Sequence, residues 1–377
     1  MKIPFNKPYF TGSETKYIEQ AVKSGKISGD GIFTKKCHEF FQERFGFKKV
    51  LLTTSCTDAL EMAAILVDIK EGDEVIIPSY TFVSSANAFV LRGARIVFAD
   101  SNGDNPNLDA DQIEALINEK TKAIVVVHYA GMANEMQKVT ALARKYGLYV
   151  IEDAAQSIDS YYLDQPLGSI GDLAAFSFHE TKNIISGEGG MIVINNDKFI
   201  ERAEIVREKG TNRSAFFRGE IDKYGWVDIG SSFLPSDVTA AILYAQLENL
   251  DKIQQKRKRI WENYHASLTG LAQNDFIKLP VIPDYATNNA HMFYILCGSQ
   301  QERQNLINHL KKSDILAVFH YLSLHKSTFF HKLHDQRPLP MTDYYSDHLL
   351  RLPFYYDLKP DEQDLIVKLI HEFYSHH

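Results

Sequence analysis

The chain has 377 residues, of which 45% are apolar and 24% charged, so it can bury the core of one large domain and one smaller domain. Its 41 basic and 48 acidic residues give a net charge of -7, which argues against a general binder of nucleic acid or anionic membranes. Three cysteines without metal-ligand spacing, and the lack of an apolar run near eighteen residues, favour a cytoplasmic protein without a disulfide framework, a zinc site or a membrane span.

Strands and helices alternate along the first part of the chain, which predicts an α/β domain with a largely parallel sheet covered on both faces. Apolar, β-branched runs predict strands at 49–54, 73–78, 94–100, 122–131, 148–157, 173–179 and 189–195. Helical periodicity predicts helices at 57–69, 85–93, 109–120 and 134–147, the last with Gly147 as its C-cap.

The pattern changes after residue 235. Residues 236–268 predict one very long helix or two in tandem. The segments that follow, at 291–297, 302–313, 315–322 and 361–374, predict a smaller α+β domain. We therefore expect a large domain at 1–245, and a linking helix with a small domain at 246–377.

Four sets of residues follow predicted strands, at the edge where an open parallel sheet binds ligands. Ser55 and Thr57 open a helix in a way that suits a phosphate, although such residues are more often plain N-caps. Asp153 ends a strand that should be buried, where a carboxylate needs a partner or forms a structural salt bridge. The other sets are residues 177–182 and the aromatic pair Tyr80 and Phe82, of which Phe82 alone is typical of a core.

In combination, these sets indicate pyridoxal phosphate (PLP). The cofactor needs a lysine for the Schiff base, an aspartate for the pyridinium nitrogen, and hydroxyls with backbone amides for the phosphate. A solvated turn lysine is the usual interpretation of an isolated Lys182, but it leaves the order of Asp153, Gln156 and Ser177 at strand ends unexplained. Lys182 precedes its glycines, and no G-x-G-x-x-G follows a strand, so nucleotide hydrolysis and nicotinamide chemistry lose their main support.

The chain resembles the DegT/DnrJ/EryC1/StrS family of sugar-nucleotide aminotransferases from about residue 3 onward, in segments that include "GDGIFTKK", "LLTTSCTDALEMAA", "IEDAAQS", "FSFHETKN" and "NAHMFYI". The resemblance implies a type I PLP-dependent aminotransferase fold, with a mixed, mostly parallel sheet, in a homodimer with shared active sites. It implies amino transfer from L-glutamate to C4 of dTDP-4-dehydro-6-deoxy-D-glucose, giving dTDP-4-amino-4,6-dideoxy-D-galactose for enterobacterial common antigen or lipopolysaccharide.

Residue by residue, the resemblance implies cofactor contacts from the Cys56 amide, Thr57, Phe82, Asp153, Gln156, Ser177 and Lys182. Lys182 would also be the catalytic base, a role that needs a partly neutral amine. Many relatives carry Asn in the segment that reaches the neighbouring subunit's phosphate, where this chain has Ser232. A serine hydroxyl is shorter, but it can still bind a phosphate oxygen.

For the nucleotide sugar, the resemblance suggests Arg213 and Arg218 as diphosphate partners, and His320 and Tyr321 as residues of the sugar pocket. Surface arginines are more often simply solvated.

Three alternatives stay open. The product could be the equatorial 4-amino-4,6-dideoxyglucose epimer or a 3-amino sugar. A family dehydratase has histidine in place of Lys182, and a regulatory homologue without activity would not need to retain the set of cofactor residues.

Overall fold

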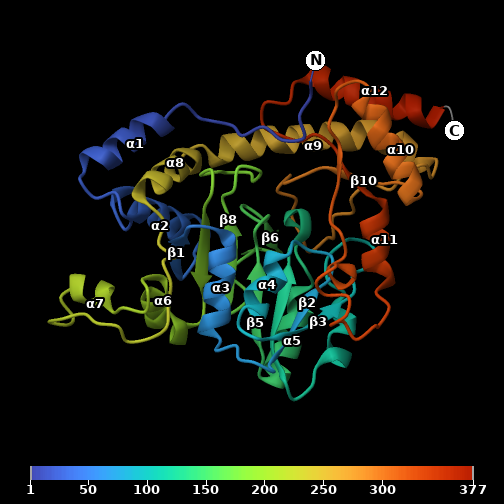
Figure 1. Ribbon diagram of the computed structural model, residues 1–377. Coiled ribbons are helices and arrows are strands. Elements are labelled where there is room, and N and C mark those ends of the chain that lie inside the picture. The colour runs from blue at the N-terminus through green and yellow to red at the C-terminus, as the bar shows by residue number, and fades with distance from the viewer. Residues whose placement is uncertain (1, 376–377) are drawn as a thin grey trace.

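The computed structural model describes residues 2–375, with a seven-stranded mixed sheet at the centre (Figure 1). The strand order is β1-β9-β8-β5-β4-β2-β3, and β9 runs antiparallel to both of its neighbours while the other pairs are parallel. Each strand lies at a predicted position. The strands are β1 (Lys49–Thr53), β2 (Glu74–Pro78), β3 (Arg95–Ala99), β4 (Thr121–Val127), β5 (Tyr149–Asp153), β8 (Leu173–Ser177) and β9 (Gly190–Ile194).

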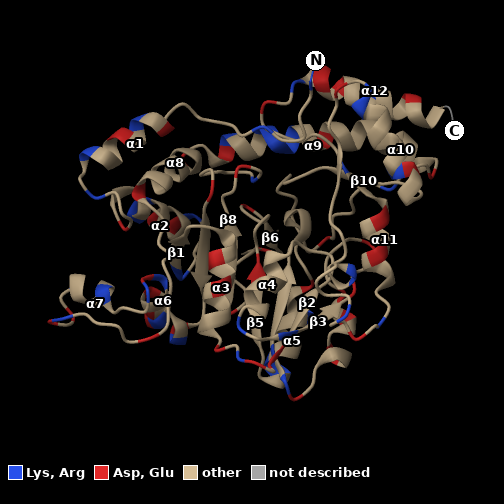
Figure 2. Cartoon of the chain, in the orientation of Figure 1, with Lys and Arg blue, Asp and Glu red and all other residues tan. Residues whose placement is uncertain are grey.

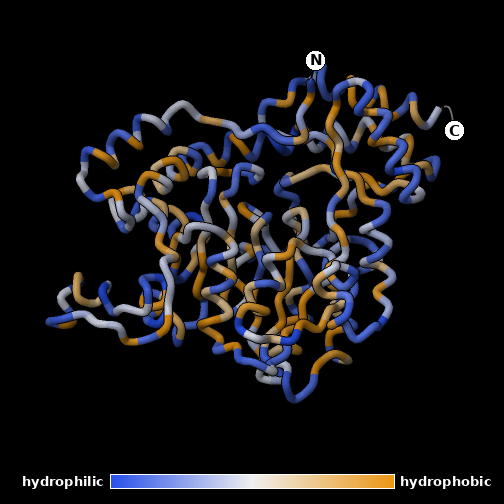
Figure 3. The backbone as a smooth tube through the Cα atoms, viewed as in Figure 1, coloured by the Kyte–Doolittle hydropathy of each residue, from blue (hydrophilic) through white to orange (hydrophobic). Residues whose placement is uncertain are grey.

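Helices cover both faces of this sheet, because successive strand residues point to opposite sides. In β1, Leu51 packs in the core under α3, α4 and α6, whereas Val50 and Leu52 pack in the core under α2 and α8. Helix α5 covers the rest of that second face. The central strands are accordingly the most hydrophobic part of the tube in Figure 3. The bounds are α1 (Glu14–Lys23), α2 (Ile32–Phe45), α3 (Cys56–Leu66), α4 (Ser84–Val90), α5 (Met136–Tyr146), α6 (Ile200–Arg207), α7 (Arg213–Phe217) and α8 (Asp237–Leu247).

The C-terminal part builds a second core around a three-stranded antiparallel sheet of order β10-β12-β11. Helix α9 carries one apolar face into this core and runs across the upper ends of the central strands (Figure 1). The elements are α9 (Leu250–Gln273), β10 (Tyr294–Leu296), α10 (Gln300–Lys311), β11 (Val318–Phe319), α11 (Pro340–His348), β12 (Leu349–Arg351) and α12 (Pro360–Ser375). A two-stranded hairpin, β6 (Tyr161–Tyr162) with β7 (Gln165–Pro166), lies outside both sheets.

One predicted helix differs in the structure. The expected helix at 109–120 forms only two 3-10 turns, η1 (Ala110–Gln112) and η2 (Glu114–Leu116). Ile113 is the only large apolar side chain fully buried there, so a longer helix would bury little more. Residues 236–268, predicted as one very long helix or two in tandem, form two, α8 and α9. Helix α11 and strand β12 were not predicted. The domain division at 245 stays a prediction.

The N-terminal segment lies against the C-terminal part of the chain. Ile3 pairs with Ile315 in an isolated parallel bridge, and the Phe354 amide donates to the Phe5 carbonyl at 3.2 Å. A second extended segment, the arm at residues 211–231 with α7, projects from the body of the molecule (Figure 1). Charged residues lie mainly on the outer helices and loops (Figure 2). Within residues 2–375, no helix is both long enough and apolar enough to span a membrane.

Candidate active site

A cavity of about 490 Å³ opens at the edge of the sheet where β1, β5 and β8 end. These three strands are parallel to one another, so their carboxyl ends meet at one edge. The predicted residues that line the cavity are Cys56, Thr57, Phe82, Asp153, Gln156, Ser177, Lys182, His320 and Tyr321. The structure therefore brings together residues spread over most of the sequence.

The N-terminus of α3 forms one wall of the cavity. Ser55 is the N-cap and accepts from the Asp58 amide at 3.1 Å, which leaves the Cys56 and Thr57 end of the helix facing the cavity. Thr57 Oγ1 lies 2.8 Å from Ser84 Oγ. A Cβ on Gly190 would lie 2.4 Å from the Cys56 nitrogen, so only glycine permits this approach. Helix-start amides with two hydroxyls fit a phosphate.

Asp153 forms the floor of the cavity at the end of β5. Its Oδ2 accepts from Ser85 Oγ at 2.6 Å, and its Oδ1 accepts from the Ala155 amide at 3.1 Å. Burial raises the pKa of Asp153, although these hydrogen bonds and the charge of Lys182 oppose the shift. The carboxylate makes no salt bridge with any residue in the described part of the chain, so it fits a protonated ring nitrogen as its partner.

Two side chains would flank a planar ring above Asp153. Phe82 is 55% exposed although it lies at the cavity, so its ring face is free to stack. Gln156 accepts from the Ala130 amide at 2.7 Å and donates to the Tyr321 hydroxyl at 3.3 Å. These bonds hold the Gln156 amide in place at the cavity wall.

Lys182 enters the cavity from the connection between β8 and β9. Its backbone amide donates to the His179 carbonyl at 2.9 Å in a tight turn, and Ser177 at the end of β8 lies at the same cavity. Burial lowers the pKa of the Lys182 amine, and the nearby Arg351 guanidinium lowers it further. The amine is therefore closer to the neutral form that a nucleophile or base requires.

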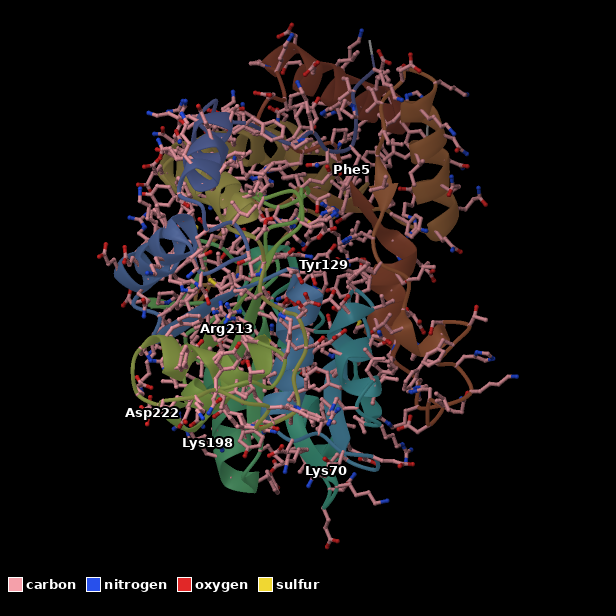
Figure 4. The ribbon with its side chains drawn as sticks, turned by 60° about the vertical axis from the view of Figure 1, so that its left-hand side comes forward. Phe5, Lys70, Tyr129, Lys198, Arg213 and Asp222 are labelled. Carbon is pink, nitrogen blue, oxygen red and sulfur yellow. The ribbon has the colours of Figure 1, made fainter. Side chains whose placement is uncertain are left out.

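Three predicted residues lie elsewhere. Arg213, Arg218 and Ser232 belong to the arm and its base, and none of them lines the cavity. Arg218 donates to Glu204 at 2.8 Å and to Glu220 at 2.6 Å, and these bonds raise its pKa. Figure 4 shows Arg213 on the arm, well separated from Tyr129 near the cavity.

Several cavity residues were not predicted from the sequence. They include Ser84, Glu188, His291 and Arg351 at the cavity, together with Ser85, which donates to Asp153. Ser84 and Ser85 come two and three residues after Phe82, and a hydroxyl pair so near an aromatic residue past a strand end was an available signal. His291 and Arg351 come from the C-terminal part, where no local pattern points toward Lys182.

Comparisons with known proteins indicate the same chemistry as the geometry of the cavity. The family model described as the DegT/DnrJ/EryC1/StrS aminotransferase family matches residues 8–371. The chain belongs to this family. It is 30% identical over 379 residues to the GDP-perosamine synthase of Vibrio cholerae, covering 99% of both chains.

Solved structures of other aminotransferases have the same fold. The putative sugar aminotransferase Spr1654 of Streptococcus pneumoniae, in its PMP form, matches with a TM-score of 0.92 and 25% identity over 99% of both chains. Helicobacter pylori PseC, an aminotransferase of pseudoaminic acid biosynthesis, matches with a TM-score of 0.90 and 25% identity over 100% of both. This member of the family is a PLP-dependent sugar aminotransferase with the type I aminotransferase fold.

Proposed function

We propose that this enzyme transfers the amino group of L-glutamate to C4 of dTDP-4-dehydro-6-deoxy-D-glucose, giving 2-oxoglutarate and dTDP-4-amino-4,6-dideoxy-D-galactose. The observation that carries the proposal is the cavity in which Lys182 and Asp153 face the same space as His320 and Tyr321. The first two supply the amine and the carboxylate of transamination. The last two come from the C-terminal part and supply polar groups for a sugar.

PLP, when bound, provides the electron sink that makes the proton on the reacting carbon acidic. Lys182 is the proposed attachment point of the cofactor and the base that moves this proton. Its buried position keeps a fraction of the amine neutral near physiological pH, because the desolvated ammonium form is disfavoured. Asp153 keeps the ring nitrogen protonated, and its hydrogen bonds from Ser85 and Ala155 fix the carboxylate in one orientation.

His320 and Tyr321 are the proposed sugar-facing residues. His320 Nδ1 lies 2.9 Å from the Tyr129 hydroxyl, and burial lowers the pKa of the imidazole well below its usual value. The ring is therefore neutral at pH 7, and one nitrogen faces the Tyr129 hydroxyl while the other is available to a sugar hydroxyl. The Tyr321 hydroxyl is fixed by Gln156, which ties the sugar side of the cavity to the cofactor side.

A homodimer with shared active sites is the assembly we propose. On the arm, Phe217 is 68% exposed and Trp226 is 83% exposed, and exposed aromatic surface of this kind is typical of an interface. A partner would bury it and receive Ser232 beside its phosphate, with Arg213 beside the nucleotide. Arg218 would first have to release Glu204 and Glu220, so we assign it the weaker part in binding diphosphate.

Subunit mixing tests the shared site. Lys182→Ala and Ser232→Asp should each be inactive alone, the second because it sets a carboxylate against the phosphate. In a mixed dimer one site carries both defects and the other carries neither, so up to about half of the sites should work. If verified subunit exchange restores no activity, the site is not shared.

A second substrate class has a specific observation in its favour. The 30% identical relative from Vibrio cholerae is named for GDP-perosamine, a sugar on a different nucleotide. A GDP-linked 4-keto sugar is therefore the runner-up. Amination at C3, an equatorial 4-amine, or a non-catalytic regulatory role are further alternatives, and a PLP absorption band in the purified protein argues against the last.

The deciding experiment is a glutamate-dependent assay with dTDP- and GDP-linked 4-keto-6-deoxy sugars, with mass detection of the amine. We expect kcat/KM to favour the dTDP sugar by at least tenfold, and NMR of the product to show an axial C4 amine. Faster turnover of the GDP sugar, or an equatorial amine, would replace the proposed substrate or product with the corresponding alternative.

A further inference from the structure

Arg351 is a buried cation at the cavity that the proposed roles leave unused. It ends β12, is 9% exposed, and lines the same cavity as Lys182. Its guanidinium carbon lies 4.6 Å from the centre of the Phe5 ring. This ring belongs to the N-terminal segment, which Figure 4 shows above Tyr129. The aromatic face supports the cation from one side without neutralising it.

The other buried arginines show how this chain normally satisfies a guanidinium. Arg207 donates two bonds of 2.8 Å to the Asp30 carboxylate, and Arg257 donates to the carbonyls of residues 290 and 291 at 3.0 and 2.6 Å. Arg303 donates to the Ser346 carbonyl. The Arg351 guanidinium has no hydrogen bond or ion pair to any residue between 2 and 375, and its Nε is fully enclosed.

The groups around Arg351 also favour an anion. Its charge lowers the pKa of Lys182, His291 and His320, so all four lie close enough to interact. The nearest acidic groups that interact with Arg351 are tyrosine hydroxyls, among them Tyr129 and Tyr321, and these are neutral at pH 7. A buried cation without a counter-charge is costly, and a carboxylate from a ligand would relieve that cost.

The position of Arg351 at the cavity indicates which kind of anion it can bind. An α-amino acid carries its carboxylate one carbon away from the nitrogen that it gives up, so its anion site must lie in the cavity that holds Lys182. The diphosphate of a nucleotide sugar is attached at C1, across the ring from C4, so it lies away from the reacting atom. The cofactor phosphate has its own site at the start of α3. Arg351 therefore fits the carboxylate of an amino acid.

We propose that Arg351 binds a carboxylate of the amino donor through a paired hydrogen bond, and that Phe5 positions its guanidinium. This inference rests on the proposed function, because it assigns a donor site to that reaction. A guanidinium binds a carboxylate with two parallel N–H···O bonds, which orient the donor amine toward the reacting centre. The enzyme would accordingly select α-amino acids over simple amines.

The two half-reactions separate the donor step from the sugar step. Arg351→Met keeps the length and apolar stem of the side chain and removes the charge. With wild-type enzyme, L-glutamate should convert bound PLP to pyridoxamine phosphate, followed by absorbance. In the Met variant this step should be about 10- to 100-fold slower, the range for losing a charge-assisted bond to a buried group. Enzyme loaded with pyridoxamine phosphate should lose much less of its rate with the keto sugar, because that step shares only the smaller effect of Arg351 on the pKa of Lys182.

A binding measurement tests the same site without turnover. Glutarate, which has carboxylates and no amine, should bind the PLP form of wild-type enzyme in calorimetry and bind the Met variant at least tenfold more weakly. Arg351→Lys should retain part of the donor step at a raised KM, because it restores the charge without the paired geometry. Phe5→Leu should raise the KM for glutamate with little change in kcat. If the Met variant fails to fold, the Lys variant and Phe5→Leu carry the test.

The outcomes distinguish a failure of the proposed function from a failure of the proposed donor site at Arg351. If wild-type enzyme does not form pyridoxamine phosphate from any α-amino acid, the proposed function fails. If wild type does so and Arg351→Met matches it, or if Arg351→Lys leaves the glutamate KM and glutarate affinity unchanged, only the donor site fails. Slowing of the sugar step alone would assign Arg351 to the nucleotide sugar and overturn the inference.

Discussion

Replacing Asp153 with asparagine tests the electronic role of this carboxylate without removing its volume. In the structure Asp153 is 6% exposed and holds two hydrogen bonds, from Ser85 at 2.6 Å and from the Ala155 amide at 3.1 Å. Asn retains an oxygen for the Ala155 amide. The Ser85 hydroxyl can turn to accept from the Asn amide and donate to Thr81 Oγ1, 2.8 Å away. The fold should therefore lose no more than about 1 kcal/mol.

The catalytic loss should be much larger than this structural loss. A charge-assisted hydrogen bond contributes about 1.5–3 kcal/mol, and loss of the proton on the ring nitrogen adds to that because the electron sink is weakened. We expect kcat to fall at least about 100-fold, since each 1.4 kcal/mol is tenfold in rate. Stopped-flow absorbance measures the rate of the glutamate half-reaction, in which this loss should appear. Cofactor affinity is determined separately by fluorescence.

Ser85→Ala is the matched control for this experiment. It removes the 2.6 Å hydrogen bond to Asp153 and leaves the carboxylate charge in place. Its rate should fall by less than about tenfold, because one hydrogen bond is lost and the counter-charge is kept. Near-normal transamination by Asp153→Asn would show that Asp153 is a structural carboxylate, and equal losses in both variants would show that orientation matters more than charge.

Three further predictions concern the lysine and the helix start. Lys182→Ala should abolish turnover and leave a folded protein, and borohydride should attach the cofactor to Lys182 in wild type only; mass spectrometry that locates it on another lysine would refute the assignment. Because burial lowers the pKa of Lys182, the pH profile of kcat should rise as the amine loses its proton, with a midpoint below pH 10.5; a midpoint at or above that value would contradict the shift. Gly190→Ala should weaken PLP binding and destabilise the fold by about 1–3 kcal/mol, because its Cβ would lie 2.3 Å from Ser55. Gly103→Ala, where a Cβ meets nothing within 4 Å, should change neither, and normal PLP affinity in Gly190→Ala would exclude this close approach.

The strands and the cofactor side of the cavity could be predicted because their signals are local. Short β-branched runs gave all seven strands of the large sheet, and parallel strands carry their carboxyl ends to one edge. Asp153 and Ser177 are the last residues of β5 and β8, as the sequence predicted, and these two strands pair with each other. Strands β8 and β9 pair antiparallel on either side of the connection that carries Lys182.

The C-terminal wall of the cavity could not be predicted in the same way. Strand β12 has three residues, too few to show a period, and it pairs with β10 and β11 across long stretches of chain. Arg351 reaches the cavity only through that pairing, and Phe5 reaches Arg351 only because the N-terminal segment lies along residues 315 and 354. Such contacts depend on tertiary packing, and the spacing of residues in the sequence does not predict them.

Burial disfavours the charged form of each ionisable group at the cavity. It raises the pKa of Asp153 and lowers the pKa of Lys182 and Arg351, so each charged form is disfavoured by desolvation. The three residues come from β5, the β8–β9 connection and β12, and none of the three forms a salt bridge with another residue in the described part of the chain. Each would instead find its counterpart in a ligand: a ring nitrogen for Asp153, an aldehyde carbon for Lys182 and a carboxylate for Arg351. Charges that weaken the folded protein therefore favour binding, because ligands that pair with them bind the folded state alone.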